Sequence, residues 1–120
     1  MAVDKHNIKL GKKGERIARR YLFFKGYKIL EKNYKCPMGE IDIIAEKKGT
    51  VAFIEVKSRL TDRYGSPSEA VDEKRRQRYI RSALFYFSGR EIDCTVRFDV
   101  IEVFKGKVNH IISAFENTGY

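Results

Sequence analysis

The sequence predicts an α/β (or α+β) domain: a mixed β-sheet of about five strands flanked by two helices, in the order αβββαββ. Apolar residues recur at helical spacing in two segments, each followed by a glycine. Between and after these segments, short runs rich in β-branched residues alternate with turn signals. The 120 residues suit a single domain spanning 1–120, because no repeat or linker divides them.

The first helix is predicted over Lys9–Lys25, with Gly26 as its C-terminal stop. Its buried side follows an i, i+1, i+4, i+5 spacing. The residues at that spacing are Ile17, Ala18, Tyr21 and Leu22. Alternating polarity then predicts a strand over Tyr27–Tyr34, and the Cys-Pro-Met-Gly sequence of residues 36–39 predicts a turn.

Two more strands are predicted over Glu40–Glu46 and Val51–Lys57, joined as a hairpin around Lys48 and Gly49. If those two residues form the turn, opposite residues have numbers that sum to 97. One face of the hairpin then consists of the pairs Ala45–Ala52, Ile43–Ile54 and Ile41–Val56. Because this face is wholly apolar, we expect it to lie on the core.

The opposite face of this hairpin carries the charged residues. It consists of the pairs Ile44–Phe53, Asp42–Glu55 and Glu40–Lys57. Two carboxylates placed opposite each other, about 5 Å apart at Cβ, destabilise a sheet. A solvated face offset by a Glu40–Lys57 pair would explain them. A site for a hard divalent cation would explain them equally well, because Mg²⁺ takes one or two carboxylates and keeps waters that a phosphate displaces.

A capping box predicts the start of the second helix, with Ser66 as N-cap, Pro67 at the first helical position and Glu69 at the third. Its predicted apolar stripe is Ile80, Ala83, Leu84 and Phe87, and Ser88-Gly89 ends it. The last two strands are predicted over residues 96–104 and 108–115, joined by a turn at Gly106.

The chain is basic: 25 Lys and Arg against 16 Asp and Glu give a formal net charge of +9. Many of these cations cluster in residues 74–78 (Lys-Arg-Arg-Gln-Arg), which favours a nucleic-acid partner over a merely Lys-rich surface. No apolar run is long enough to span a bilayer, and no signal peptide opens the sequence, so we expect a cytoplasmic protein without a membrane partner. Cys36 and Cys94 lack the paired spacing of a zinc or redox site, so we expect two reduced thiols.

Glu15 occupies a costly place in the first helix. It precedes Ala18 by three residues and Leu22 by seven, so it lies near the buried stripe. A glutamate that reaches water, or that pairs with Arg19 or Arg20, would explain this position. A glutamate aimed at a cation held by the neighbouring hairpin explains it better.

Asp42, twelve intervening residues and then Glu55-Val56-Lys57 resemble the Asp…(Asp/Glu)-x-Lys core of the PD-(D/E)xK nuclease superfamily. A preceding helix that bears Glu15 is similar to the archaeal Holliday-junction resolvases of that superfamily. More closely, almost the whole chain resembles the small bacterial YraN-like family of predicted endonucleases. The matching stretches include Gly14-Glu15, Gly39–Ala45 (Gly-Glu-Ile-Asp-Ile-Ile-Ala), Phe53–Arg59 and Arg97–Ile101.

The resemblance implies a restriction-endonuclease-like core and a metal-dependent endonuclease activity. The implied ligands for Mg²⁺ or Mn²⁺ are Asp42, Glu55, the backbone carbonyl of Val56, and Glu15. Glu15 would alternatively orient a metal-bound water. Lys57 would orient the attacking water or stabilise charge on the phosphorane oxygens, and Glu40 would support the site by orienting Lys57.

Nucleic acid is the expected partner, with branched or damaged DNA as the expected substrate. The residues expected to contact it are Arg59, Lys74, Arg75, Arg76, Gln77 and Arg78. Arg75, Arg76 and Arg78 are predicted to point outward toward phosphates, and Lys74 and Gln77 toward the sheet. Two alternatives remain open: a non-catalytic nucleic-acid-binding module on the same fold, and a structure-specific RNA endonuclease. The protein would act as a monomer or a homodimer.

Overall fold

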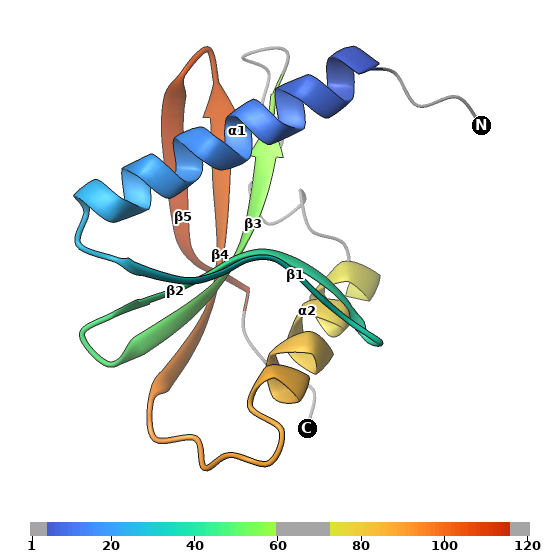
Figure 1. Ribbon diagram of the computed structural model, residues 1–120, viewed down its shortest axis with the longest axis vertical. Helices are drawn as coiled ribbons and strands as arrows, with labels where there is room; N and C mark the ends of the chain where they lie inside the picture. The colour runs from blue at the N-terminus through green and yellow to red at the C-terminus, as the bar shows by residue number, and fades with distance from the viewer. Residues whose placement is uncertain (1–4, 60–72, 116–120) are drawn as a thin grey trace.

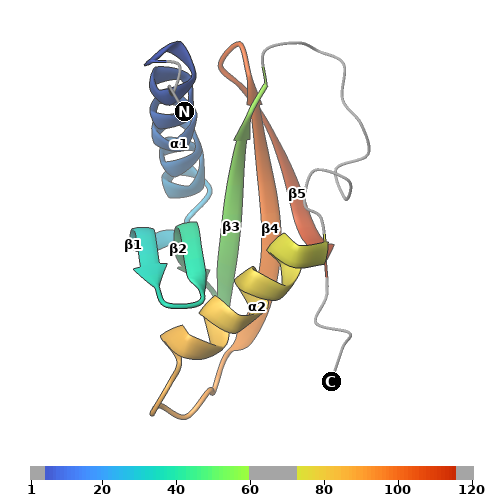
Figure 2. The same ribbon diagram turned by 90° about the vertical axis from the view of Figure 1, so that its right-hand side faces the viewer.

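The computed structural model describes residues 5–59 and 73–115 and confirms the predicted order αβββαββ (Figure 1). The strands are β1 (Lys28–Cys36), β2 (Gly39–Lys47), β3 (Thr50–Ser58), β4 (Thr95–Phe104) and β5 (Lys107–Phe115). They lie side by side in chain order, and the sheet is mixed because β3 and β4 are parallel while the other neighbours are antiparallel. The helices α1 (Lys5–Phe24) and α2 (Glu73–Tyr86) cover opposite faces of the sheet (Figure 2).

Helix α1 packs on one face of the sheet along the predicted stripe. Ala18 and Leu22 are fully buried, in a cluster with Ile54 of β3 and Ile101 of β4. The helix contains no membrane-length apolar segment, and neither does the other described helix. Cys36 and Cys94, both within the described residues, are free thiols as predicted.

Helix α2 packs on the other face, but its buried side differs from the prediction. Ile80 and Ala83 are buried as expected, whereas Leu84 is 50% exposed and Tyr79 is buried in its place. The buried side of α2 is therefore centred nearer Tyr79, Ile80 and Ala83 than the predicted stripe. Tyr79 was not expected there because its ring is apolar but its tip is polar. The capping box predicted at residues 66–69 lies outside the described residues.

The β2–β3 hairpin has the predicted turn. Lys48 and Gly49 both have positive φ (49° and 79°), as a type I′ turn requires. The predicted register is confirmed from Lys47–Thr50 to Ile43–Ile54. Both faces of the hairpin are buried, rather than one. Ala45 and Ala52 lie in the apolar cluster under α1, and Ile44 and Phe53 lie in the apolar cluster under α2.

Beyond Ile43 the register prediction is wrong. Ile41, expected beside Ile43, packs instead with Ile44 in the cluster under α2. The regular β2–β3 pairing ends at Ile43–Ile54, and the β1–β2 hairpin curves away from β3 toward α2 (Figure 1). The sheet is therefore forked, and Asp42 lies at the point where the two strands diverge.

Candidate active site at the fork of the sheet

The fork brings together three of the predicted site residues. The regular backbone pairing of β2 with β3 ends at Ile43–Ile54. In its place, the Oδ2 atom of Asp42 accepts a hydrogen bond of 2.8 Å from the backbone N–H of Val56. Glu55 and Lys57 flank Val56 on β3. Asp42 and Glu55 are thus held close by a side-chain bridge across the fork, and not by the direct cross-strand pairing that the sequence predicted.

Glu55 is a buried carboxylate with one oxygen satisfied and one not. The residue is only 2% exposed, and its Oε1 lies 2.8 Å from Arg75 Nη2 and 3.5 Å from Lys57 Nζ. Its Oε2 is buried, and no hydrogen-bond partner for it exists among residues 5–59 and 73–115. An unpaired buried carboxylate oxygen is costly, which is typical of a position prepared for a ligand.

Two predicted contacts around Glu55 need correction. The expected Glu40–Lys57 pair is replaced by Lys57–Glu55, while Glu40 lies opposite Lys35 on β1. Arg75, expected to point outward, turns onto Glu55 from α2. Both corrections have the same cause: the buried charge of Glu55 attracts the cations nearest to it.

The fork concentrates negative charge around Asp42. Burial is the main cause that raises the pKa of Asp42 to about 6. The charges of Glu15, Glu55 and Glu40 act in the same direction, and the hydrogen bond from Val56 opposes them. Since burial and three neighbouring carboxylates all act on Asp42, the site disfavours the ionised form of Asp42 in the absence of a cation.

Glu15 acts on this cluster from α1 through its charge. Burial raises the pKa of Glu15, and the positive charge of Arg19 and a hydrogen bond from the Asn33 side chain oppose that shift. Asn33 has a φ of 51° within β1, a left-handed conformation that asparagine tolerates better than most residues. Glu15 is brought close to the sheet by its neighbour Gly14, because a Cβ on Gly14 would lie 2.0 Å from Ser58 Oγ at the end of β3.

Tyr79 is a site residue that the sequence prediction missed. It projects from α2 and is 5% exposed; burial, together with the charges of Asp42 and Glu55, raises its pKa well above 10. The signal was available, since Tyr79, Ile80, Ala83, Tyr86 and Phe87 follow an i, i+1, i+4, i+7, i+8 spacing.

A cleft opens beside these residues, between α2 and the β1–β2 turn. Its volume is about 580 Å³. Asp42, Tyr79 and Arg75 line its inner part, and Lys35 and Arg78 are among the cations at its wall. Gly39 forms the close approach of the turn to α2: its φ is 151°, and a Cβ there would lie 3.5 Å from Arg78 Cβ. The cleft therefore opens Asp42 and Glu40 to solvent beside three cations, whereas Glu55 is not among its lining residues.

The structure places the remaining predicted nucleic-acid contacts in several different settings. Arg59 forms an ion pair of 2.6 Å with Glu102, which is 1% exposed. Arg76 lies over the ring of Phe115, and Gln77 donates a hydrogen bond to Glu73 on the exposed side of α2, not toward the sheet. Lys74 and Arg78 are exposed.

A metal fits the fork only in part through protein ligands. Within residues 5–59 and 73–115, no three Asp, Glu, His or Cys side chains are arranged to hold an ion. Two carboxylates, Asp42 and Glu55, do converge, and the unpaired Oε2 of Glu55 offers a free ligand atom. This donor set suits Mg²⁺, which is commonly held by one or two carboxylates together with waters and substrate phosphates.

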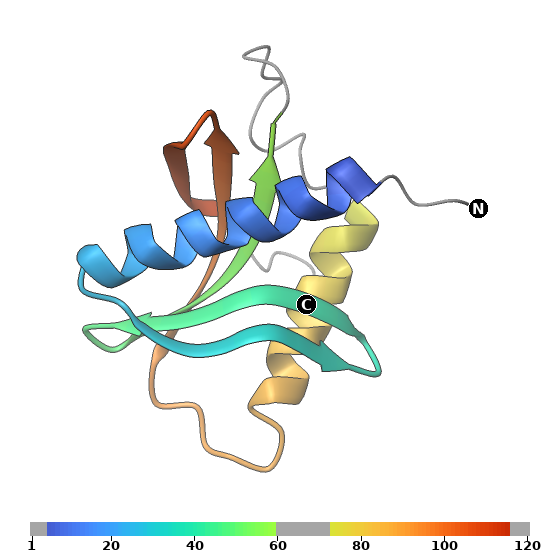
Figure 3. The ribbon, with the colours of Figure 1, turned by 45° about the horizontal axis from the view of Figure 1, so that its top comes forward.

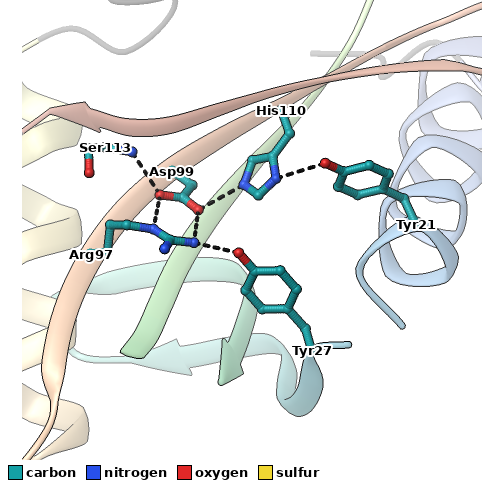
Figure 4. Close-up of polar contacts among 6 residues, drawn as sticks. All are labelled: Tyr21, Tyr27, Arg97, Asp99, His110 and Ser113. Carbon is teal, nitrogen blue, oxygen red and sulfur yellow. Dashed lines mark hydrogen bonds and ion pairs between the residues drawn. The ribbon is translucent and has the colours of Figure 1, made fainter. Parts of the chain in front are cut away.

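A second buried charge cluster lies on the α1 face of the sheet, and its members had no predicted role (Figure 4). Asp99 is fully buried and accepts two hydrogen bonds of 2.9 Å from Arg97. His110 Nε2 lies 2.8 Å from Asp99, and His110 Nδ1 lies 3.1 Å from the Tyr21 hydroxyl. Arg97 also donates to Tyr27. Since Asp99 has several partners here, this cluster serves packing and contrasts with the unsatisfied fork.

Comparison with known proteins gives one consistent match. The model of the uncharacterised protein family UPF0102 matches residues 14–103, which include the whole fork. A UPF0102 protein of Thermodesulfovibrio yellowstonii is 48% identical over 108 residues, covering 90% of this chain and 96% of the relative. UPF0102 proteins of Caldanaerobacter subterraneus (46% over 114 residues; 88% and 93% covered) and Clostridioides difficile (45% over 113 residues; 92% and 99% covered) are similar.

Proposed function

The chain belongs to the uncharacterised protein family UPF0102, and for this member we propose a divalent-metal-dependent endonuclease that hydrolyses phosphodiester bonds in DNA, on branched or damaged structures. The observation that carries the proposal is the fork itself. Asp42 lines a cleft that also carries cations, and its side chain bonds the backbone of Val56, next to Glu55 with its unpaired buried oxygen and to Lys57. The arrangement agrees with the resemblance of Asp42 and Glu55-Val56-Lys57 to the PD-(D/E)xK nucleases.

In this proposal Asp42, Glu55 and the backbone carbonyl of Val56 hold Mg²⁺ or Mn²⁺. Such an ion, when bound, supplies Lewis-acid neutralisation of phosphate charge and a water of lowered pKa. Glu15, whose charge acts on Asp42, would join the same ligand set or accept a hydrogen bond from that water.

The cationic and phenolic groups act on the phosphate. Lys57 is held beside Glu55, from where its ammonium group orients the attacking water or stabilises charge on the phosphorane oxygens. Tyr79 stays protonated at neutral pH, so its hydroxyl is a hydrogen-bond donor at the inner end of the cleft. Hydrolysis adds one water across a P–O bond and leaves a phosphate monoester and a hydroxyl end.

The direct test is cleavage of a panel of labelled single-stranded, duplex, flap and four-way DNA and of structured RNA, with Mg²⁺ or Mn²⁺ and with chelator. We expect metal-dependent cutting of a DNA substrate that falls by about 10²-fold or more in Asp42→Asn, Glu55→Gln and Lys57→Ala. DNA binding should survive in the lysine variant.

Glu46→Gln and Lys28→Ala are matched controls, because both side chains are exposed and lie away from the fork. Undiminished cutting by all three fork variants would show that the activity resides elsewhere. Binding without any cutting, by the parent and on every substrate, would favour a non-catalytic binding module, and cutting of RNA alone would replace DNA as substrate.

A further inference from the structure

The outward side of α1 and the adjacent strand β1 form a basic groove that the sequence prediction did not single out. Figure 3 shows α1 running beside the β1–β2 hairpin. Two hollows lie along this side, of about 590 and 530 Å³, and they share Arg19 and Lys32 in their walls. The cations that line them are Lys12, Lys13, Arg16, Arg19, Arg20 and Lys32.

The cations of this groove outnumber its carboxylate, so net positive charge is left for an external anion. Arg19 and Lys12 act on the charge of Glu15, and no ion pair within residues 5–59 and 73–115 involves a cation of the groove. The α1 basic face contrasts with α2, where Arg75 pairs with Glu55 and Arg76 lies over Phe115. One carboxylate, Glu15, lines the groove, and Asn33 of β1 lies beside it in the same wall. Glu15 is also the residue of the groove that the proposed function places at the candidate active site.

The far end of the groove carries two exposed aromatic rings. Phe23 is 69% exposed and Phe24 is 83% exposed, with their ring centroids 5.7 Å apart in an edge-to-face arrangement. Arg19 and Arg20 line the same hollow as these rings. Exposed aromatic rings beside cations form the usual platform for unpaired bases, which stack on the rings while the phosphates contact the cations. Bases in a duplex are stacked on their neighbours and do not present a face to such rings.

We propose that the α1–β1 groove binds a single-stranded segment of nucleic acid, with a base stacked on Phe23 or Phe24 and phosphates along the groove cations. The part of α1 that lines the groove, residues 12–24, is about 20 Å long at 1.5 Å per residue, which is enough for a few nucleotides. The proposal deepens the proposed endonuclease function and rests on it for one point only, that the strand so bound is the strand delivered to the fork. The substrate class is then nucleic acid with an unpaired segment, such as a flap or branch.

Binding is tested with the full chain in chelator, where cleavage does not interfere, by fluorescence anisotropy of a labelled single strand and of the same strand annealed. Phe23→Ser/Phe24→Ser should weaken single-strand binding about tenfold, the value of one stacked base, and leave duplex binding within twofold. Arg16→Gln/Arg20→Gln/Lys32→Gln should reduce the log–log salt slope for the single strand by about 0.7 for each phosphate that the groove no longer neutralises.

The matched control is Leu84→Ser/Phe85→Ser, which removes two exposed apolar side chains from α2. The proposal would be overturned if the phenylalanine variant bound the single strand as well as the parent, or if the control lost as much single-strand affinity as that variant. It would also be overturned if the parent did not bind the single strand. The proposal would also be overturned if the groove variants lost binding to phosphatidylserine vesicles but still bound the oligonucleotide as the parent does. The face would then be a lipid-binding surface. If the parent still cuts DNA in a metal-dependent manner when one of these results is obtained, the proposed endonuclease function is retained. Only the proposal that the groove binds the single strand is then rejected.

Discussion

At the scale of single residues, the fork depends on how one buried carboxylate is neutralised. Glu55 Oε1 faces Arg75 and Lys57, whereas Oε2 has no partner in the described residues. Arg75 is 43% exposed at its side chain, so its ion pair is partly screened and is worth about 0.2–1 kcal/mol. Arg75 therefore neutralises Glu55 only weakly, and a divalent metal ion that binds Glu55 can displace the guanidinium group from it.

This arrangement predicts that Arg75→Gln binds Mn²⁺ or Mg²⁺ more tightly than the parent, by up to about fivefold, because the metal no longer competes with the guanidinium for Glu55. Isothermal titration of the nucleic-acid-free protein measures the affinity. Arg78→Gln is the matched control, since it removes an arginine from the same cleft that does not contact Glu55. Weaker metal binding in Arg75→Gln, or an equal gain in the control, would contradict the role assigned to Arg75.

The sequence predicted that Asp42, Glu55 and Lys57 lie on neighbouring strands and Glu15 on the first helix, because these placements depend on alternation and helical spacing, which are local. Their roles in a site stay predictions. The sequence did not identify Tyr79 or the turn of Arg75 onto Glu55, because both depend on the rotation of α2 about its axis. In the observed rotation Tyr79 is buried and Arg75 contacts Glu55. A prediction from apolar content alone buries Leu84 instead, which is 50% exposed.

At the scale of elements, the position of α1 depends on one glycine. Gly14 is buried, and a Cβ at this position would lie 2.0 Å from Ser58 Oγ and 3.3 Å from Ser58 Cβ. α1 can approach the end of β3 only without a side chain here. The same approach carries Glu15 toward the fork, so a packing requirement and a site requirement coincide in adjacent residues.

Gly14→Ala should therefore destabilise the protein by up to about 2 kcal/mol, because overpacking of about 1–3 kcal/mol outweighs the gain of about 1 kcal/mol in helix propensity. Gly11→Ala is the control on the same helix: nothing lies within 4 Å of its added Cβ, so only the propensity gain applies and stability should rise. Urea denaturation gives both values. In a double-mutant cycle, Ser58→Ala should recover part of the stability. Equal effects at both glycines would show that α1 is not held by this contact.

The turns of the sheet were predictable for a similar local reason. Lys48-Gly49 and Lys105-Gly106 both have two successive residues with positive φ, which the X-Gly pair indicates from sequence. The fork was not predictable, because the residues of β2 before Ile43 alternate in sequence like the rest of the strand although they leave β3. Only the burial of Ile41 under α2, paired with β1 but not with β3, reveals the divergence.

At the scale of the whole molecule, the two charge clusters respond to pH in opposite directions. The Asp99 cluster joins Tyr21 of α1 to β4 and β5, and hydrogen bonds from His110, Arg97 and the Ser113 backbone lower the pKa of Asp99 although burial opposes them. Its stabilisation is present above the ordinary pKa of 3.8 and is lost as pH falls through the lower folded value. At the fork, the folded pKa of Asp42 is about 6 against an ordinary 3.8. Its contribution is therefore complete below pH 3.8 and is lost as pH rises through about 6.

As far as Asp42 is concerned, the metal-free protein should be most stable near pH 4, lose about 1–3 kcal/mol between about pH 4 and 6, and stay level from there to pH 7.5. Urea denaturation across this range in chelator measures the profile. Asp42→Asn keeps an oxygen for the Val56 N–H but cannot ionise, so it should flatten this fall and be more stable than the parent at pH 7.5. Saturating Mg²⁺ should stabilise the parent at that pH and do much less for the variant, because only the parent keeps both carboxylates. Asp93→Asn, an exposed control, should follow the parent. A parent whose stability rises steadily from pH 4 to 8 would show instead that the carboxylates of the fork are stabilised by their neighbours and do not repel one another.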